Sequence, residues 1–117
     1  METTLYHYRA HITKVYDGDT CTVDIDLGLK IWTRDETVRL YGINAPEVRG
    51  VERPQGLLSR DFLRGKILDK DVIVETFQDE KGKYGRWLAT IWLEEDGNWT
   101  NINKLLVDQG FAEYKDY

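Results

Sequence analysis

Three short stretches of this chain carry side chains that could hold a metal ion and a phosphate group together. Asp19, Asn44 and Glu47 offer carboxylate or amide oxygens, and Arg39 and Arg86 offer guanidinium groups. Each stands where a turn interrupts strand-like sequence. Hard cations such as calcium prefer oxygen ligands, and an arginine fork can bind a phosphate through two parallel hydrogen bonds. Phosphodiester cleavage is the chemistry that needs both groups at one place.

The first stretch is centred on Asp17-Gly18, a pair that signals a tight turn between two strands. Asp17 therefore has a structural explanation as the first residue of the turn. Turn chemistry does not require Asp19, which we expect just past the turn, at the start of the next strand. Asp19 is accordingly a candidate metal ligand, in company with backbone carbonyls and water.

The second stretch is a loop in which Asn44 and Glu47 bracket Ala45-Pro46. Pro46 disfavours helical backbone at Ala45 and so stiffens the loop. A rigid loop can hold a general base within hydrogen-bonding reach of an attacking water, and Glu47 is the candidate for that base. Asn44 can offer a neutral oxygen to the same ion. Ordinary loop polarity is the alternative explanation for each residue taken singly.

The arginines lie at strand ends, Arg39 near the close of one strand-like segment and Arg86 at the start of another. Two arginines could clamp a phosphate and stabilise the charge that grows on its oxygens in the transition state. Lysine lacks that fork geometry. The alternative is that both are solvated strand residues.

The elements that must position these side chains follow from hydrophobic periodicity. Period-two alternation, as at Cys21, Val23 and Ile25, predicts strands over 6–15, 20–27, 30–41, 71–77 and 86–93. Helical spacing, including Leu58 with Phe62, predicts a helix over 54–68 and another from about 101 to Gly110. This α+β, mainly β order predicts a five-stranded barrel of the oligonucleotide/oligosaccharide-binding type with two main helices. An open α+β sheet is the alternative.

Composition restricts the number of domains, the location of the protein and its binding partners. A chain of 117 residues, 41% of them hydrophobic and 32% charged, predicts a single domain over 1–117 with one core and no membrane partner. No signal peptide or apolar span is visible, so we expect a cytoplasmic monomer. The single cysteine, Cys21, is predicted to be a core residue. The net charge of −5 opposes strong binding of nucleic acid, unless basic groups cluster locally.

Taken in order, the motifs resemble the staphylococcal nuclease-like (thermonuclease) domain. The matching pieces are Val15-Tyr16-Asp17-Gly18-Asp19-Thr20, Val38-Arg39-Leu40 through Ala45-Pro46-Glu47, Lys83-Tyr84-Gly85-Arg86-Trp87-Leu88-Ala89, and Gly110-Phe111-Ala112. The resemblance runs from about Val15 to Ala112 and implies a barrel with helices. It also implies calcium-dependent hydrolysis of DNA or RNA, single strands favoured, by a metal-associated water that leaves a 3′-phosphate and a 5′-hydroxyl.

The resemblance also assigns roles. Asp19, Asn44 and Ala45, the last through its backbone carbonyl, match the metal-binding positions, and Glu47 matches the general base or water-positioning glutamate. Arg39 and Arg86 match the arginines that grip the scissile phosphate. Lys83 and Tyr84 match residues that contact a second phosphate of the bound nucleotide.

Two residues at the predicted metal site differ from the family pattern. Well-known members have aspartate at the position of Asn44 and threonine at that of Ala45. An asparagine keeps an oxygen but removes a charge, so we expect weakly bound calcium. The chain also stops at Tyr117, without the third helix of the longer nucleases. Tyr114 and Tyr117 could stack on a base or serve as surface residues.

Two rival interpretations stay open. A catalytically weak or inactive module of the same fold would bind nucleic acid or a protein partner, and Asn44 and the acidic charge favour it. A barrel that binds a small anion at the two arginines without cleaving it is the other. Low calcium affinity with intact oligonucleotide binding would favour the first, and binding of a short bisphosphate nucleotide alone would favour the second.

Overall fold

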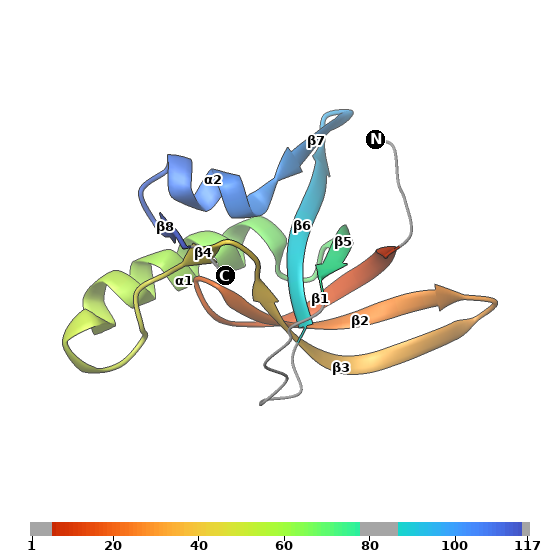
Figure 1. The fold of residues 1–117 in the computed structure, drawn as a ribbon, viewed down its shortest axis with the longest axis horizontal. Coiled ribbons are helices and arrows are strands. Elements are labelled where there is room, and N and C mark those ends of the chain that lie inside the picture. Colours follow the sequence, from red (N-terminus) through yellow and green to blue (C-terminus); the bar gives the residue numbers. More distant parts are fainter. Residues whose placement is uncertain (1–5, 78–86, 116–117) are drawn as a thin grey trace.

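Five strands curl into a closed barrel with two helices packed against it (Figure 1). The structure is a computed structural model and describes residues 6–77 and 87–115. The barrel strands are β1 (His7–Asp17), β2 (Thr20–Gly28), β3 (Ile31–Leu40), β5 (Asp71–Phe77) and β6 (Trp87–Glu95). The helices are α1 (Arg53–Ile67), preceded by the 3-10 turn η1 (Gly50–Glu52), and α2 (Ile102–Asp108). The predicted barrel with two helices is confirmed.

The barrel closes where the ends of β3 and β6 meet. The sheet runs in the order β3-β2-β1-β5-β6-β7, and β3 also pairs with β6 in parallel. That pairing joins Val38 to Trp87, Arg39 to Leu88 and Leu40 to Ala89. The alternative of an open sheet is therefore wrong. Closure places Arg39 at the seam, where the sheet is paired on both sides of β3.

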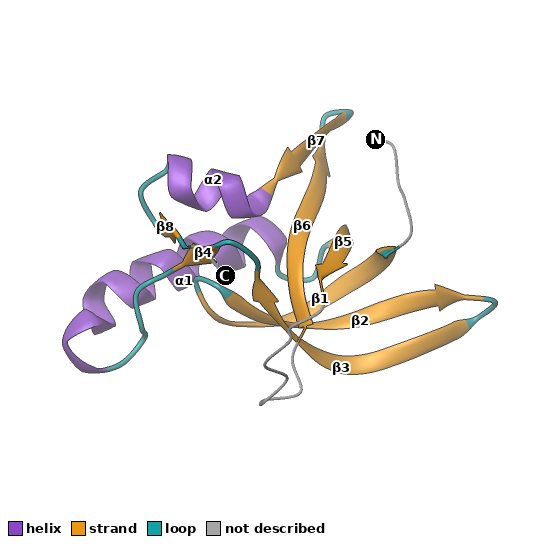
Figure 2. Ribbon diagram, in the orientation of Figure 1, coloured by secondary structure: helices purple, strands orange, loops and turns teal. Residues whose placement is uncertain are grey.

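Three short strands were not predicted. β7 (Asn98–Asn101) forms a hairpin with β6 across the turn at Asp96-Gly97, and β4 (Ile43–Asn44) pairs with β8 (Glu113–Tyr114) in a separate two-stranded sheet. Figure 2 shows β4 and β8 beside each other, away from the long strands. The small sheet ties the segment after α2 to the loop that follows β3.

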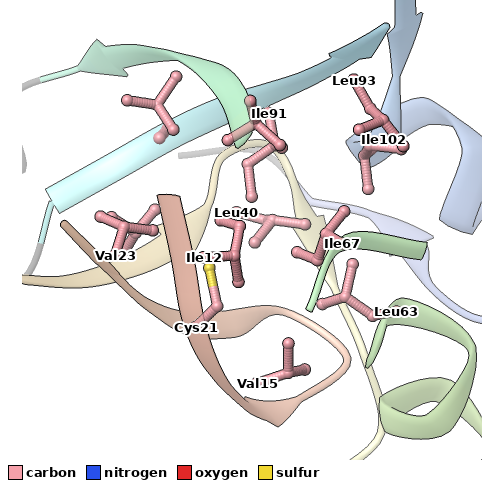
Figure 3. Packing of buried hydrophobic residues seen from close by; sticks show 14 of the residues in the cluster. Ile12, Val15, Cys21, Val23, Leu40, Leu63, Ile67, Ile91, Leu93 and Ile102 are labelled. Atoms are coloured by element: carbon pink, nitrogen blue, oxygen red, sulfur yellow. The ribbon is translucent and has the colours of Figure 1, made fainter. Parts of the chain in front are cut away.

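The core fills the barrel and the space beneath α1. Buried side chains from β1, β2 and β3, among them Ile12, Val23 and Leu40, meet Leu63 and Ile67 of α1 (Figure 3). Cys21 belongs to this core, and burial raises the pKa of its thiol to about 12. The prediction of a structural cysteine is confirmed, since a thiol with that pKa stays protonated and inert.

Helix α1 begins with Pro54 in its first turn, as predicted. Its buried stripe consists of Gly56, Ser59, Leu63 and Ile67. Leu58 was predicted on the apolar side, but its side chain is exposed, because the helix is rotated so that the two small residues face the barrel. Small residues let the helix approach the loop and the turn closely.

Helix α2 begins at a capping residue, since the Asn101 side chain accepts a hydrogen bond from the Lys104 backbone N–H. Its buried Asn103 binds the barrel seam. The side-chain oxygen accepts from Ile91 N–H at 3.1 Å, and the amide nitrogen donates to the carbonyls of Tyr41 at 2.9 Å and Ala89 at 3.0 Å. Asn103 thus connects the end of β3 to the middle of β6. Neither helix is long and apolar enough to cross a membrane, as far as the described residues extend.

Candidate active site

The turn between β1 and β2 holds two buried carboxylates. Gly18 and Asp19 are its central residues, so Asp19 lies within the turn and not just past it as predicted. Asp17 accepts a hydrogen bond from the Asp19 backbone N–H at 3.0 Å, and the side chains of Asp17 and Asp19 are only 7% and 5% exposed. The Asp19 carbonyl accepts from Leu40 N–H at 2.8 Å, which fixes the turn against β3.

Gly18 is required here by close packing. A Cβ atom at this position would lie 2.8 Å from the Cβ atoms of both Ala45 and Ser59. The turn, the loop after β4 and helix α1 therefore meet at a point where no side chain fits. This contact brings Asp19 against the loop that carries Asn44 and Glu47.

Arg39 is the cation of this site and is buried at the seam of the barrel, 7% exposed. One Nη atom lies 3.3 Å from the Asp19 carboxylate, and the other donates to the Ile43 carbonyl at 3.3 Å and to Asn44 Oδ1 at 3.2 Å. A solvated strand arginine is therefore excluded as the explanation of Arg39. The guanidinium joins the turn of Asp19 to β4.

The loop after β4 completes the cluster through its backbone. Ala45 N–H donates to Asp19 Oδ2 at 2.8 Å, and Thr20 Oγ1 donates to Asp19 Oδ1 at 3.2 Å. Asn44 is exposed on β4, although its side-chain oxygen is bound by Arg39. The structure thus brings four predicted residues together: Asp19, Arg39, Asn44 and Ala45.

Glu47 is exposed and follows this cluster by two residues. Its backbone is held by helix α1, because a Cβ atom at Gly56 would lie 2.0 Å from the Glu47 carbonyl oxygen. Only a glycine permits the helix to approach the loop so closely. The side chain is exposed on a loop whose backbone is held by the helix, and its role as a water-positioning residue stays a prediction.

The remaining predicted residues, Lys83, Tyr84 and Arg86, lie outside the described residues, as does Tyr117. Tyr114 is described, and its side chain is 67% exposed on β8.

Comparison with known proteins decides the family. The family model of the staphylococcal nuclease homologue matches residues 37–117. The chain belongs to the staphylococcal nuclease family. It is 32% identical over 109 residues to a thermonuclease of Staphylococcus intermedius and 30% identical over 109 residues to one of Staphylococcus hyicus. It is also 29% identical over 128 residues to an uncharacterized protein of Methanocaldococcus jannaschii.

Each of these matches covers 91% of the chain. The chain spans 59% of the length of the two staphylococcal thermonucleases and 58% of the archaeal protein. The similarity to these relatives therefore extends over most of the chain.

The electrostatics of this staphylococcal nuclease-family site favour a bound cation. Burial, and then the hydrogen bond and charge repulsion from Asp19, raise the pKa of Asp17 from 3.8 to about 7. Arg39 contacts Asp19 and is the only cation for which an ion pair with either aspartate is found among the described residues. A carboxylate has about four acceptor positions, and three donors to Asp19 are identified: Ala45 N–H, Arg39 and Thr20.

The oxygen atoms that these residues could offer a hard cation are two carboxylates and one amide, and Arg39 already donates to the amide oxygen. Within residues 6–77 and 87–115, no group of three or more His, Cys, Asp or Glu side chains is clustered closely enough to hold a metal. Such a site would depend on backbone oxygens and water for most of its ligands and would bind weakly, as the sequence predicted for calcium.

Sequence reasoning missed two residues that shape this site of the family. Thr20 donates to Asp19, and Gly56 lets α1 hold the loop of Glu47. Thr20 lies within the Asp-Gly-Asp-Thr motif and could have been found there. Gly56 carried no local signal beyond its place in a predicted helix, where glycine is unfavourable.

Proposed function

We propose that this chain hydrolyses phosphodiester bonds of DNA or RNA, with single strands favoured, and that calcium is its cofactor. The observation that carries the proposal is the buried Asp19–Arg39 pair, held at 3.3 Å beside an exposed loop that bears Asn44 and Glu47. Membership of the staphylococcal nuclease family supports the reaction class. A single strand of nucleic acid is the proposed substrate, because its flexible backbone can approach the buried Arg39 more readily than a stiff duplex can.

Arg39 would hold the scissile phosphate. Its contacts to Ile43 and Asn44 are 3.3 and 3.2 Å, longer than the 2.7–2.9 Å of a strong charge-assisted bond. A phosphate oxygen would therefore be a better acceptor than either protein oxygen for the same N–H groups. Arg86 is proposed as the second arginine of the clamp. Lys83 and Tyr84 are proposed to contact a neighbouring phosphate.

Glu47 would take the proton of the attacking water. The water oxygen forms a bond to phosphorus, the bond from phosphorus to the 5′-oxygen breaks, and the leaving oxygen takes a proton from solvent. The products are a 3′-phosphate and a 5′-hydroxyl. As a general base, Glu47 would contribute about 10²–10⁴-fold to the rate.

Asp19 and Asn44 would hold the calcium ion through their side chains, and Ala45 through its backbone carbonyl. When bound, calcium supplies positive charge beside the phosphate and brings water to the site. The Ala45 N–H already donates to Asp19. That bond orients the carboxylate.

A non-catalytic module that binds nucleic acid is the second candidate. The neutral Asn44 and the net charge of −5 favour it, because both lower the affinity for calcium or for a polyanion.

The test is cleavage of single-stranded DNA at low salt by the parent and Glu47→Gln, in calcium or in chelator. We expect calcium-dependent cleavage by the parent and a loss of at least about 100-fold in Glu47→Gln. Glu94→Gln removes the same charge from an exposed position on β6 and should cleave like the parent. Oligonucleotide binding without cleavage, at any calcium concentration up to about 10 mM, would establish the binding module instead.

A further inference from the structure

Helix α1 turns an apolar side chain away from the barrel. Its buried stripe contains Gly56 and Leu63, whereas Leu58 and Gly65 are exposed. Two residues along a helix correspond to a rotation of about 200°, so Leu58 lies almost opposite Gly56. The N-terminal half of the helix extends beyond the barrel strands (Figure 1). Leu58, 55% exposed, is therefore an apolar residue that the fold of one chain does not use.

Gly65 lies on the same outer face of the helix, where no contact within residues 6–77 and 87–115 requires a glycine. A Cβ atom at this position would have no neighbour within 4 Å, and glycine inside a helix is less favourable than alanine. Gly65 also lines a groove between α1 and β6, together with Phe62 and Leu93. A glycine at such a place lets another chain approach the helix backbone closely.

The spacing of Leu58 and Gly65 makes this outer face complementary to itself. The two residues are about 10.5 Å apart along the helix axis, with Asp61 and Phe62 midway between them. When two copies of α1 pack antiparallel around a two-fold axis at this midpoint, Leu58 of each copy lies opposite Gly65 of the other. The leucine then fills the space that the glycine leaves open, as a side chain fills the hole on a facing helix in other helix pairs.

The charges at the midpoint also fit a second copy of the chain. Arg60 and Asp61 form an ion pair at 3.0 Å, so each copy brings one charge of each sign to the two-fold axis. Like charges without such compensation would oppose the contact. A nucleic acid would instead meet the Asp61 side chain, which is 60% exposed at the centre of this face. Among protein partners, a copy related by a two-fold axis is the commonest arrangement.

We propose that this chain forms a two-fold symmetric dimer through the outer faces of two antiparallel α1 helices, with Leu58 of each copy packed over Gly65 of the other. Gly56 contacts the Glu47 loop on the opposite side of the helix, so dimer formation does not depend on the proposed nuclease activity. A contact between two helices is small, and interfaces that bury less than about 1,200 Å² are typical of weak complexes. We therefore expect a reversible dimer whose population rises with protein concentration.

Sedimentation equilibrium of the full chain, from about 10 μM to about 1 mM, measures the association. The proteins are the parent, Leu58→Gly, Gly65→Leu, and the double variant with both changes. Leu58→Gly removes the leucine, Gly65→Leu places two leucines opposite each other, and the double variant exchanges the two positions. Val51→Gln is the control, because it removes an apolar side chain that is 99% exposed outside the helix. Circular dichroism checks that each variant is folded.

We expect a monomer–dimer equilibrium in the parent and a dissociation constant raised at least about tenfold in each single variant, because the symmetry repeats each change twice in the dimer. The double variant should associate like the parent again, since leucine and glycine still oppose each other, and Val51→Gln should also associate like the parent.

A parent that stays monomeric up to about 1 mM would overturn the proposal and leave this face for a protein of different sequence. Equal association of the parent and the two single variants would overturn it as well. Loss of association in the single variants without recovery in the double variant would show that Leu58 and Gly65 do not oppose each other, which contradicts the antiparallel arrangement.

Discussion

At the residue scale, the site is dominated by two buried carboxylates that share one turn. Asp17 and Asp19 are less than a tenth exposed, and Arg39 lies 3.3 Å from Asp19. Burial and the neighbouring Asp19 raise the pKa of Asp17 to about 7. An arrangement that is unfavourable for the folded chain alone becomes favourable once a cation is bound, because the cation stabilises both ionised groups.

This arrangement predicts that, in chelator, the free energy of unfolding decreases as the pH rises. The raised pKa of Asp17 means that the folded state keeps its proton between pH 3.8 and about 7, while the unfolded state has already lost it. The contribution of Asp17 to the free energy of unfolding is therefore complete below pH 3.8, decreases as the pH rises to about 7, and is lost above it. Asp17→Asn should remove this decrease and unfold at higher urea concentration than the parent at pH 8.

Urea unfolding at pH 5 and pH 8 checks this prediction. Asp96→Asn, on the β6–β7 turn, is the matched control, since asparagine tolerates the positive φ of 52° found there. It should show the same dependence on pH as the parent. Parallel pH profiles for the parent and Asp17→Asn would show that Asp17 is not the group that titrates.

At the element scale, helix α1 holds the loop that carries Glu47 by close approach. Gly56 contacts the backbone of Glu47 so closely that a Cβ atom would lie 2.0 Å from its carbonyl oxygen. Gly65, nine residues later on the same helix, has nothing within 4 Å of the corresponding position. The two glycines form a natural pair for comparison, because helix propensity is the same at both and only the surroundings differ.

We predict opposite effects of alanine at these positions. Gly56→Ala should lower the free energy of unfolding by roughly 1–3 kcal/mol, because the loop or the helix must move. Gly65→Ala should raise it by about 0.5–1 kcal/mol, since alanine favours the helix. Denaturant titration measures both values, and equal effects at the two positions would contradict the close packing of Gly56. Cleavage should fall in Gly56→Ala only, if Glu47 acts as proposed.

Some of the strands and helices could be predicted from the sequence, and others could not. Alternation as regular as that of Cys21, Val23 and Ile25 suffices to predict a strand, and helical spacing suffices to predict α2. Strands of two residues, such as β4 and β8, have no period to detect and exist because tertiary pairing brings them together. The rotation of α1 that exposes Leu58 is likewise set by Gly56 and Ser59 against the loop, which no local pattern reveals.

At the scale of the whole molecule, barrel closure creates the site from distant segments. The parallel pairing of β3 with β6 buries Arg39, and the turn at Asp19 is bound to the loop at Ala45 across 26 residues. Sequence motifs named Asp19, Arg39, Asn44 and Ala45 as candidates for one site. Their contacts could not be derived from the motifs, because they depend on which strand ends the closed barrel brings together.

The net charge of −5 also belongs to this scale and predicts how nucleic acid is bound. Helix α1 carries arginines that could have formed a basic track, but Arg60 contacts Asp61 at 3.0 Å and Arg64 donates to the Val15 carbonyl at 3.0 Å. Arg60 is thus paired with a carboxylate, and Arg64 is held against a backbone carbonyl. Phosphate binding should therefore depend on the few cations of the site and release few counterions.

We expect the logarithm of the affinity for single-stranded DNA to fall with the logarithm of salt with a slope of roughly −0.7 to −1.4, the value for one or two neutralised phosphates. Fluorescence anisotropy with Glu47→Gln, which should bind without cleaving, measures the slope between about 50 and 200 mM KCl at fixed calcium. Arg60→Gln should leave the slope unchanged, because that arginine is paired with Asp61. A slope of about −4 or steeper, reduced in Arg60→Gln, would instead indicate an extended basic path along α1. Affinity for nucleic acid would then come from the surface of the helix, and the site at the barrel seam would contribute only the cleavage.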